Sequence, residues 1–95
     1  WIYRSPYLSN EGSRFLVERK VRAVGIDHFS IGGTGDENEE THRILLGAGI
    51  VVIEGLQLNF PELAQGEWHV MALPLKIRDS SGAPARVVAF QTAGD

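Results

Sequence analysis

A histidine and a glutamate that flank an apolar run are the residues best suited to chemistry. The stretch HRILLGAGIVVIEGL, residues 42–56, begins with His42 and carries Glu54 near its end. A neutral imidazole and a carboxylate are common ligands of Zn²⁺ and Mn²⁺, and a bound metal offsets the cost of burying the carboxylate. These residue types therefore indicate a candidate metal site. From spacing alone, a half-buried helix histidine and a solvated strand-end glutamate remain the commoner interpretation.

A helix is predicted to carry the histidine. Asp36 and Glu39 stand at capping-box spacing, and further acidic residues fill the same first turn. This pattern predicts a helix over residues 37–46 that ends at Gly47 or Gly49.

A strand is predicted to return the glutamate toward that helix. On the helix, His42 shares a face with Leu45 and Leu46, and this face should point inward. IVVIEGL, residues 50–56, is typical of a buried strand. From His42 the helix advances about 8 Å to its end, and the strand returns about 13 Å to Glu54. The two side chains can therefore meet.

The remaining segments predict short alternating elements. Residues 10–20 should form a helix capped by Ser9, and VRAVGID (21–27) a strand covered on both faces. Pro74 in the strand at 67–77 requires a sheet edge or a bulge, and the last strand, 85–91, should pair with it antiparallel. We predict a mixed α/β (α+β) fold, with helices packed on a mixed sheet, in which residues 1–95 form a single domain or a partial domain.

Composition excludes several classes of function. With 43% hydrophobic and 22% charged residues the chain is typical of a globular domain, and its formal net charge is only −3. Because the basic residues are scattered, we expect neither nucleic acid nor a membrane as a partner. The absence of cysteine fits a reducing, cytoplasmic location. Since the chain opens without methionine, we expect it to be the distal part of a longer protein.

Several phrases in order resemble a known family. VRAVGID followed by Ser30, then HRILLGAGIVVIEGL, ALPLKI and GAPARVVAF, is similar to the C-terminal half of the cyclase family of metal-dependent hydrolases, the group that contains bacterial kynurenine formamidase. The resemblance covers essentially the whole chain and implies the family's swivelling β/β/α domain, incomplete here. Carried over, His42 and Glu54 are two metal ligands. Asp27 and Ser30 fall near the pocket, although by themselves they are ordinary strand-end and loop residues.

The chain lacks the rest of the family's site. The signature HxGTHxDxPxH, which supplies the other ligands and a catalytic histidine, is absent, and neither His28 nor His69 lies in such a motif. Lys20 replaces a glycine common after the first helix, and Gly32 stands where the family often has an acid. We therefore predict no catalytic residue in this chain, weak binding of Zn²⁺ or Mn²⁺, and no activity of the chain alone.

The resemblance implies a reaction for the complete protein. A divalent metal activates water for hydrolysis of the C–N bond of a small-molecule amide or formamide, as in an arylformamidase. Asp27 is a candidate acceptor for the imidazole of the metal-binding histidine. Trp1, with Tyr3 and Tyr7, could contact an aryl substrate, although core or subunit packing suits these residues better.

Two other classes of function fit parts of the sequence. The turn GGTG, residues 32–35, suggests a phosphate binder, but no phosphate-binding motif is completed and acidic residues crowd the next helix. The stronger alternative is a catalytically inactive cyclase-like fragment that acts as an oligomeric structural or binding module. Because an incomplete sheet exposes an edge, we expect a homo-oligomer, most simply a two-fold dimer.

Overall fold

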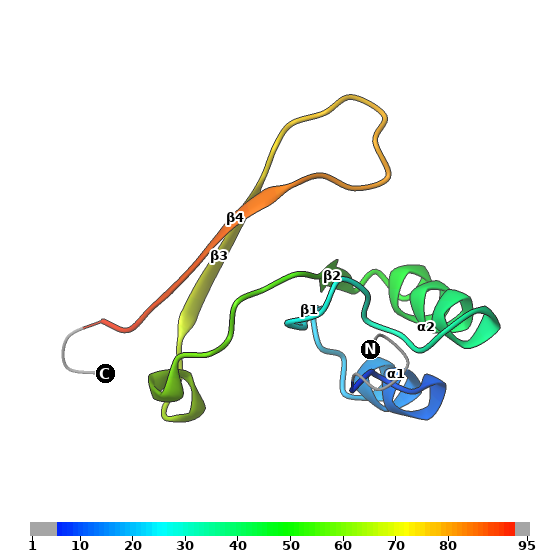
Figure 1. The fold of residues 1–95 in the computed structure, drawn as a ribbon, viewed down its shortest axis with the longest axis horizontal. Coiled ribbons are helices and arrows are strands. Elements are labelled where there is room, and N and C mark those ends of the chain that lie inside the picture. The colour runs from blue at the N-terminus through cyan, green and yellow to red at the C-terminus, as the bar shows by residue number, and fades with distance from the viewer. Residues whose placement is uncertain (1–5, 93–95) are drawn as a thin grey trace. The chain divides into compact units, whose positions relative to one another are not determined.

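A computed structural model describes residues 6–92, and their mixed α/β fold confirms the predicted class. The chain divides into two compact units, Trp1–Leu58 and Asn59–Asp95. None of the described helices is both long enough and apolar enough to cross a bilayer. The elements are α1 (Asn10–Glu18), β1 (Ala23–Gly25), α2 (Asp36–Gly47), β2 (Val51–Ile53), the 3-10 helix η2 (Pro61–Ala64), β3 (His69–Pro74) and β4 (Ala85–Phe90) (Figure 1).

Helix α1 begins as predicted and ends slightly earlier than predicted. The Ser9 side chain caps it by accepting a hydrogen bond from a backbone N–H of the first turn. At its other end the Lys20 N–H donates to the Val17 carbonyl (3.0 Å) and the Val21 N–H donates to the Leu16 carbonyl (3.4 Å). This is a Schellman motif, which places Lys20 in the left-handed region at φ 57°. Lys20 thus adopts the left-handed conformation that glycine adopts most easily.

Helix α2 corrects the predicted capping box. Gly35, with φ 59°, is the N-cap residue, and no side chain caps the helix. Asp36 is therefore already the first helical residue, because the preceding turn needs a positive φ that glycine adopts most easily. The C-terminal end repeats the Schellman motif, with Gly49 at φ 78° and the Ile50 N–H donating to the Leu45 carbonyl at 3.0 Å.

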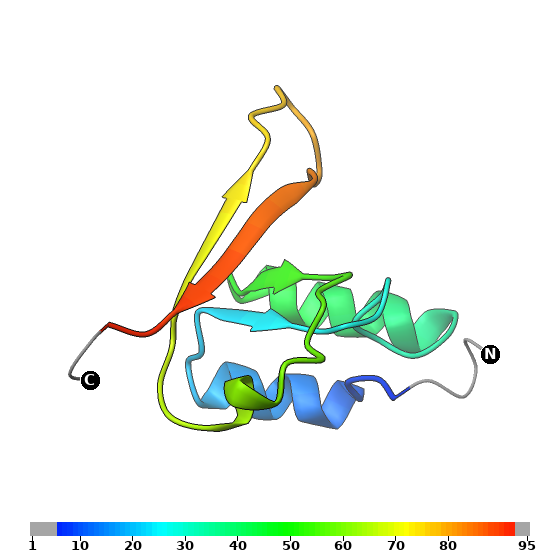
Figure 2. The ribbon, with the colours of Figure 1, turned by 60° about the vertical axis from the view of Figure 1, so that its left-hand side comes forward.

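The first unit packs both helices against one face of a small sheet. Strands β1 and β2 pair in parallel, with Val24 opposite Val52 in register, and both helices lie on one side of them (Figures 1 and 2). The core consists of Ile31, Leu45 and Ile50, against which the two valines pack.

Two burial predictions for this unit were wrong. The strand predicted over residues 21–27 is three residues long, and only its central Val24 is half-buried, because the helices of this unit pack against one face of the sheet. On α2, Leu45 is buried but its neighbour Leu46 is exposed, since only one narrow stripe of this helix meets the sheet.

The second unit is a β-hairpin. Strands β3 and β4 pair antiparallel, as predicted, from His69 opposite Phe90 to Pro74 opposite Ala85. Pro74 ends β3 and lies in a two-stranded sheet, where each strand is an edge, so its missing N–H is tolerated. The strands of the described chain thus form two sheets of two strands each, one parallel and one antiparallel. The single or partial domain expected for residues 1–95 stays a prediction.

Candidate metal centre

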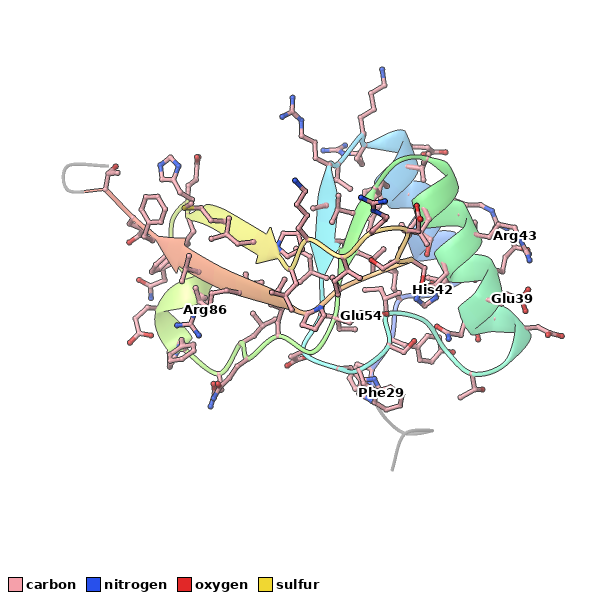
Figure 3. All side chains as sticks on the ribbon, turned by 90° about the horizontal axis from the view of Figure 1, so that it is seen from above. Phe29, Glu39, His42, Arg43, Glu54 and Arg86 are labelled. Atoms are coloured by element: carbon pink, nitrogen blue, oxygen red, sulfur yellow. The ribbon has the colours of Figure 1, made fainter. Side chains whose placement is uncertain are left out.

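The structure brings His42 and Glu54 into contact within the first unit. His42 lies in the middle of α2, and Glu54 directly follows β2. The histidine Nε2 lies 3.1 Å from the glutamate Oε2, and each side chain is 31% exposed. Figure 3 labels both side chains, which come from these two elements and point toward one another. The predicted convergence of the two side chains is confirmed. The chain turns after α2, and β2 returns far enough to bring Glu54 beside His42, as the lengths of the two elements predicted.

The orientation of the His42 ring is fixed from its other nitrogen. Nδ1 lies 2.9 Å from the backbone oxygen of Asn38, one turn earlier on α2. A carbonyl oxygen only accepts hydrogen bonds, so Nδ1 carries the proton and donates it. Nε2 is therefore the nitrogen available to a metal. The acceptor is this carbonyl rather than the carboxylate of Asp27, which had been a candidate for the role.

The Glu54 carboxylate is held by a loop of the same unit. Its Oε2 accepts a hydrogen bond of 2.9 Å from the backbone N–H of Ile31, whose side chain lies in the core. The same oxygen faces His42 Nε2, so two lone-pair donors meet there. Such a contact is favourable when a cation lies between the two atoms, either a proton on the nitrogen or a metal ion.

The donor set fits two positions of a metal's coordination shell. Two ligand atoms at about 2.0–2.1 Å from a tetrahedral zinc ion lie roughly 3.3 Å apart, close to the 3.1 Å separation of the two side chains here. Within residues 6–92 no group of three or more histidine, cysteine or acidic side chains converges on one point. The two donors therefore match part of a site, and their role as metal ligands stays a prediction.

The residues expected near the pocket differ in their positions. Ser30 donates from Oγ to Asn38 Oδ1 at 2.9 Å and lines a hollow of about 610 Å³, whose wall also includes Tyr7 and Phe29. Asp27 is exposed. Trp1 and Tyr3 lie outside the described residues.

One residue near the pair was missed by sequence reasoning. Asn38 contacts His42 through its backbone and Ser30 through its side chain. Its position one helical turn before the histidine was the only signal that could have indicated it, because side chains and carbonyls four residues apart are neighbours on a helix.

The contacts of the glycine-rich turn argue against a phosphate binder. The Gly32 N–H donates to Asn38 Oδ1 at 3.1 Å, and the Ile31 N–H donates to Glu54. These donors are used within the protein rather than presented to an anion. On the outer side of α2, Arg43 pairs with Glu39 at 2.9 Å, and both side chains are well exposed (Figure 3). Glu39 thus belongs to a solvated surface.

The sequence of this chain is similar to part of known bacterial enzymes. No protein-family model matches this chain. Kynurenine formamidase of Bacillus cereus is 34% identical over 83 residues, which cover 87% of this chain and 39% of that protein. Kynurenine formamidase of Delftia acidovorans is 33% identical over 73 residues, or 77% of this chain and 34% of that protein.

The fold of this chain is also similar to part of a solved structure. It is a potential metal-dependent hydrolase with cyclase activity, 36% identical to this chain, with a TM-score of 0.75. The similarity covers 85% of this chain and 39% of that protein. The chain therefore spans about two fifths of the length of the Bacillus cereus protein and of the solved structure.

Proposed function

Since this chain belongs to the cyclase family of metal-dependent hydrolases and matches part of it, we propose that it contributes His42 and Glu54 to a divalent-metal site that hydrolyses amide or formamide C–N bonds. The contact of 3.1 Å between Nε2 and Oε2 carries this proposal. It is supported by the Nδ1 contact to a backbone carbonyl, which leaves Nε2 directed at the site. The chain supplies part of the site and no catalytic residue.

The two side chains have different roles in this proposal. His42 provides a neutral nitrogen and Glu54 a negative oxygen, a combination that suits Zn²⁺ or Mn²⁺. When bound, such a metal supplies Lewis acidity that activates water and polarises a carbonyl. The name kynurenine formamidase, carried by the relatives, supports an aryl formamide as the substrate class. Tyr7 and Phe29 line the hollow, whose wall includes Asn38 but neither His42 nor Glu54, and we propose their rings as a contact surface for such a substrate.

Metal titration tests the proposal directly. Calorimetric titration of the chain with Zn²⁺ and with Mn²⁺ should show weak one-to-one binding, because catalytic sites commonly use three protein ligands. His42→Ala should abolish the binding, and Glu39→Gln, on the solvated side of α2, should leave it unchanged. Absence of binding by the wild-type chain would refute the proposal. Tight binding together with turnover of N-formylkynurenine would show that the chain holds a complete site.

A non-catalytic role as an oligomeric module is the second candidate. The observation that favours it is the exposure of large apolar side chains on the β3–β4 hairpin, among them Val70, Met71, Leu73 and Phe90. Both strands are edges, so a second copy could pair along one of them in a two-fold dimer. Light scattering should then give the mass of a dimer at micromolar concentration, and a monodisperse monomer would exclude this arrangement. For either role we propose a cytoplasmic location, which the absence of cysteine supports.

A further inference from the structure

Asn38 contacts His42 of the candidate metal centre directly and is linked to Glu54 through a loop. Its backbone oxygen accepts the hydrogen bond from His42 Nδ1 at 2.9 Å. Its side-chain Oδ1 accepts two further bonds, from Ser30 Oγ at 2.9 Å and from the Gly32 N–H at 3.1 Å. One residue of α2 thus binds the histidine through its main chain and the loop after β1 through its side chain.

The loop between those two bonds holds the glutamate. Ile31 lies between Ser30 and Gly32, and its N–H donates to Glu54 Oε2 at 2.9 Å. The Ile31 side chain is buried in the core, so apolar packing also holds the loop in place. Three successive residues therefore donate in turn to Asn38, Glu54 and Asn38. The contacts form a closed ring that runs from His42 through Asn38 and the loop to Glu54 and back.

The fit between loop and helix depends on a glycine. A Cβ atom at Gly32 would lie 2.5 Å from Asn38 Oδ1 and 2.9 Å from Asn38 Cα, too close for any larger residue. The close approach of Gly32 to α2 and the double acceptor on Asn38 are therefore parts of one arrangement.

We propose that Asn38 is a positioning residue that aligns Glu54 with His42, a role that rests on the proposed function. The carbonyl of Asn38 fixes which imidazole nitrogen faces the site. Its amide oxygen fixes the loop, and through the Ile31 N–H it fixes the rotamer of the Glu54 carboxylate. Partners of this kind, which hold a ligand without touching the metal, commonly change metal affinity by about 10–100-fold when they are removed.

The test compares three variants of the full chain. Asn38→Leu removes the Oδ1 atom that accepts both bonds from the loop, at similar side-chain volume, and leaves the backbone oxygen that accepts from His42. Asn38→Asp keeps an oxygen for both donors and serves as the conservative rescue. Glu39→Leu adds a leucine at the next, solvated position of α2 and controls for that change. Zinc affinity is measured by calorimetry, and amide exchange at Ile31 and Gly32 is measured by NMR on the metal-free protein.

The expected results separate positioning from general destabilisation. Asn38→Leu should weaken zinc binding about tenfold and speed exchange at both amides roughly threefold to tenfold, as for the loss of about one hydrogen bond. Amides of helix α1, which does not contain Asn38, should keep their exchange rates. Asn38→Asp should restore both properties, and Glu39→Leu should match the wild type. The His42 Nδ1 proton should persist when zinc binds.

Three outcomes would overturn the inference. They are an unchanged zinc affinity in Asn38→Leu, an equal loss of affinity in Asn38→Leu and Asn38→Asp, and loss of the Nδ1 proton on zinc binding. If the wild-type chain binds no zinc, the proposed function fails as well, and the exchange rates still show whether Asn38 fixes the loop.

Discussion

The two units of this chain differ in how far their paired strands bury apolar side chains. In the first, the short strands β1 and β2 have one face covered by α1 and α2, and Leu45 at the centre is 0% exposed. In the second, the longer strands β3 and β4 have six residue pairs in register, yet Leu73 remains 53% exposed. The unit with the shorter strands has the buried core, and the candidate metal centre lies in that unit.

This difference separates backbone pairing from burial. A hairpin satisfies its own N–H and C=O groups locally, whereas an apolar side chain is buried only when another layer covers it. An isolated two-stranded hairpin is marginally stable in water. Precise side-chain geometry therefore needs the layered unit, because a ligand pair must be held by neighbours that cannot move independently.

The largest expected effect comes from the core of the first unit. Leu45→Ala should lower the free energy of unfolding by about 2–5 kcal/mol, because it leaves a cavity in a small core. Leu73→Ala on the hairpin should change it by less than about 0.5 kcal/mol, since little buried area is lost. Leu46→Ala, on the same helix but exposed, is the matched control. Urea unfolding followed by circular dichroism measures all three.

Equal losses from the core leucine and the hairpin leucine would contradict the comparison. They would mean that the hairpin side chain is covered in solution, for instance by a second copy of the chain.

The next effect concerns metal binding. Glu54→Gln should weaken zinc binding at least about tenfold, or about 1.4 kcal/mol, because it removes the negative ligand. The variant should stay folded, since an amide oxygen can still accept from the Ile31 N–H. His69→Gln, which removes a histidine stacked on Phe90 in the hairpin, should leave zinc binding unchanged. Calorimetry would show the site to be elsewhere if the hairpin variant alone lost affinity.

The smallest effect concerns left-handed residues. Lys20 and Asp79 have φ of 57° and 59°, one in each unit. Lys20→Gly should stabilise the protein by about 0.5 kcal/mol, because glycine adopts this conformation without strain and the residue closes a helix that packs on the core. Asp79→Gly should be nearly neutral, since aspartate tolerates the left-handed region. Thermal unfolding measures both, and a larger gain at Asp79 would reverse the expectation.

The candidate site was predictable in part. The types and spacing of His42 and Glu54 predicted two side chains that could meet, because helix rise and strand rise fix how far each returns. The chemistry of Asn38 was not predictable in the same way. Its amide binds a loop six to eight residues earlier in the chain, and the path of that loop depends on how Ile31 enters the core.

Element boundaries show a similar division. The caps at Ser9 and Gly49 are local, so the sequence indicated where α1 begins and α2 ends. The capping box at Asp36 was wrong because Gly35 takes the cap position when the turn adopts a positive φ. The alternatives differed by one residue, and the preceding loop decided between them.

The sequence by itself determined the fold class, the antiparallel hairpin, the family and the two residues that meet at the candidate metal centre. Each of these depends on local propensity, on element length or on several phrases in order. The tertiary structure alone decided which face of β1 and α2 is covered, which nitrogen of His42 faces Glu54, and which residue holds the loop between them. Those features depend on contacts between segments distant in the chain, and such contacts exist only after the layers have packed.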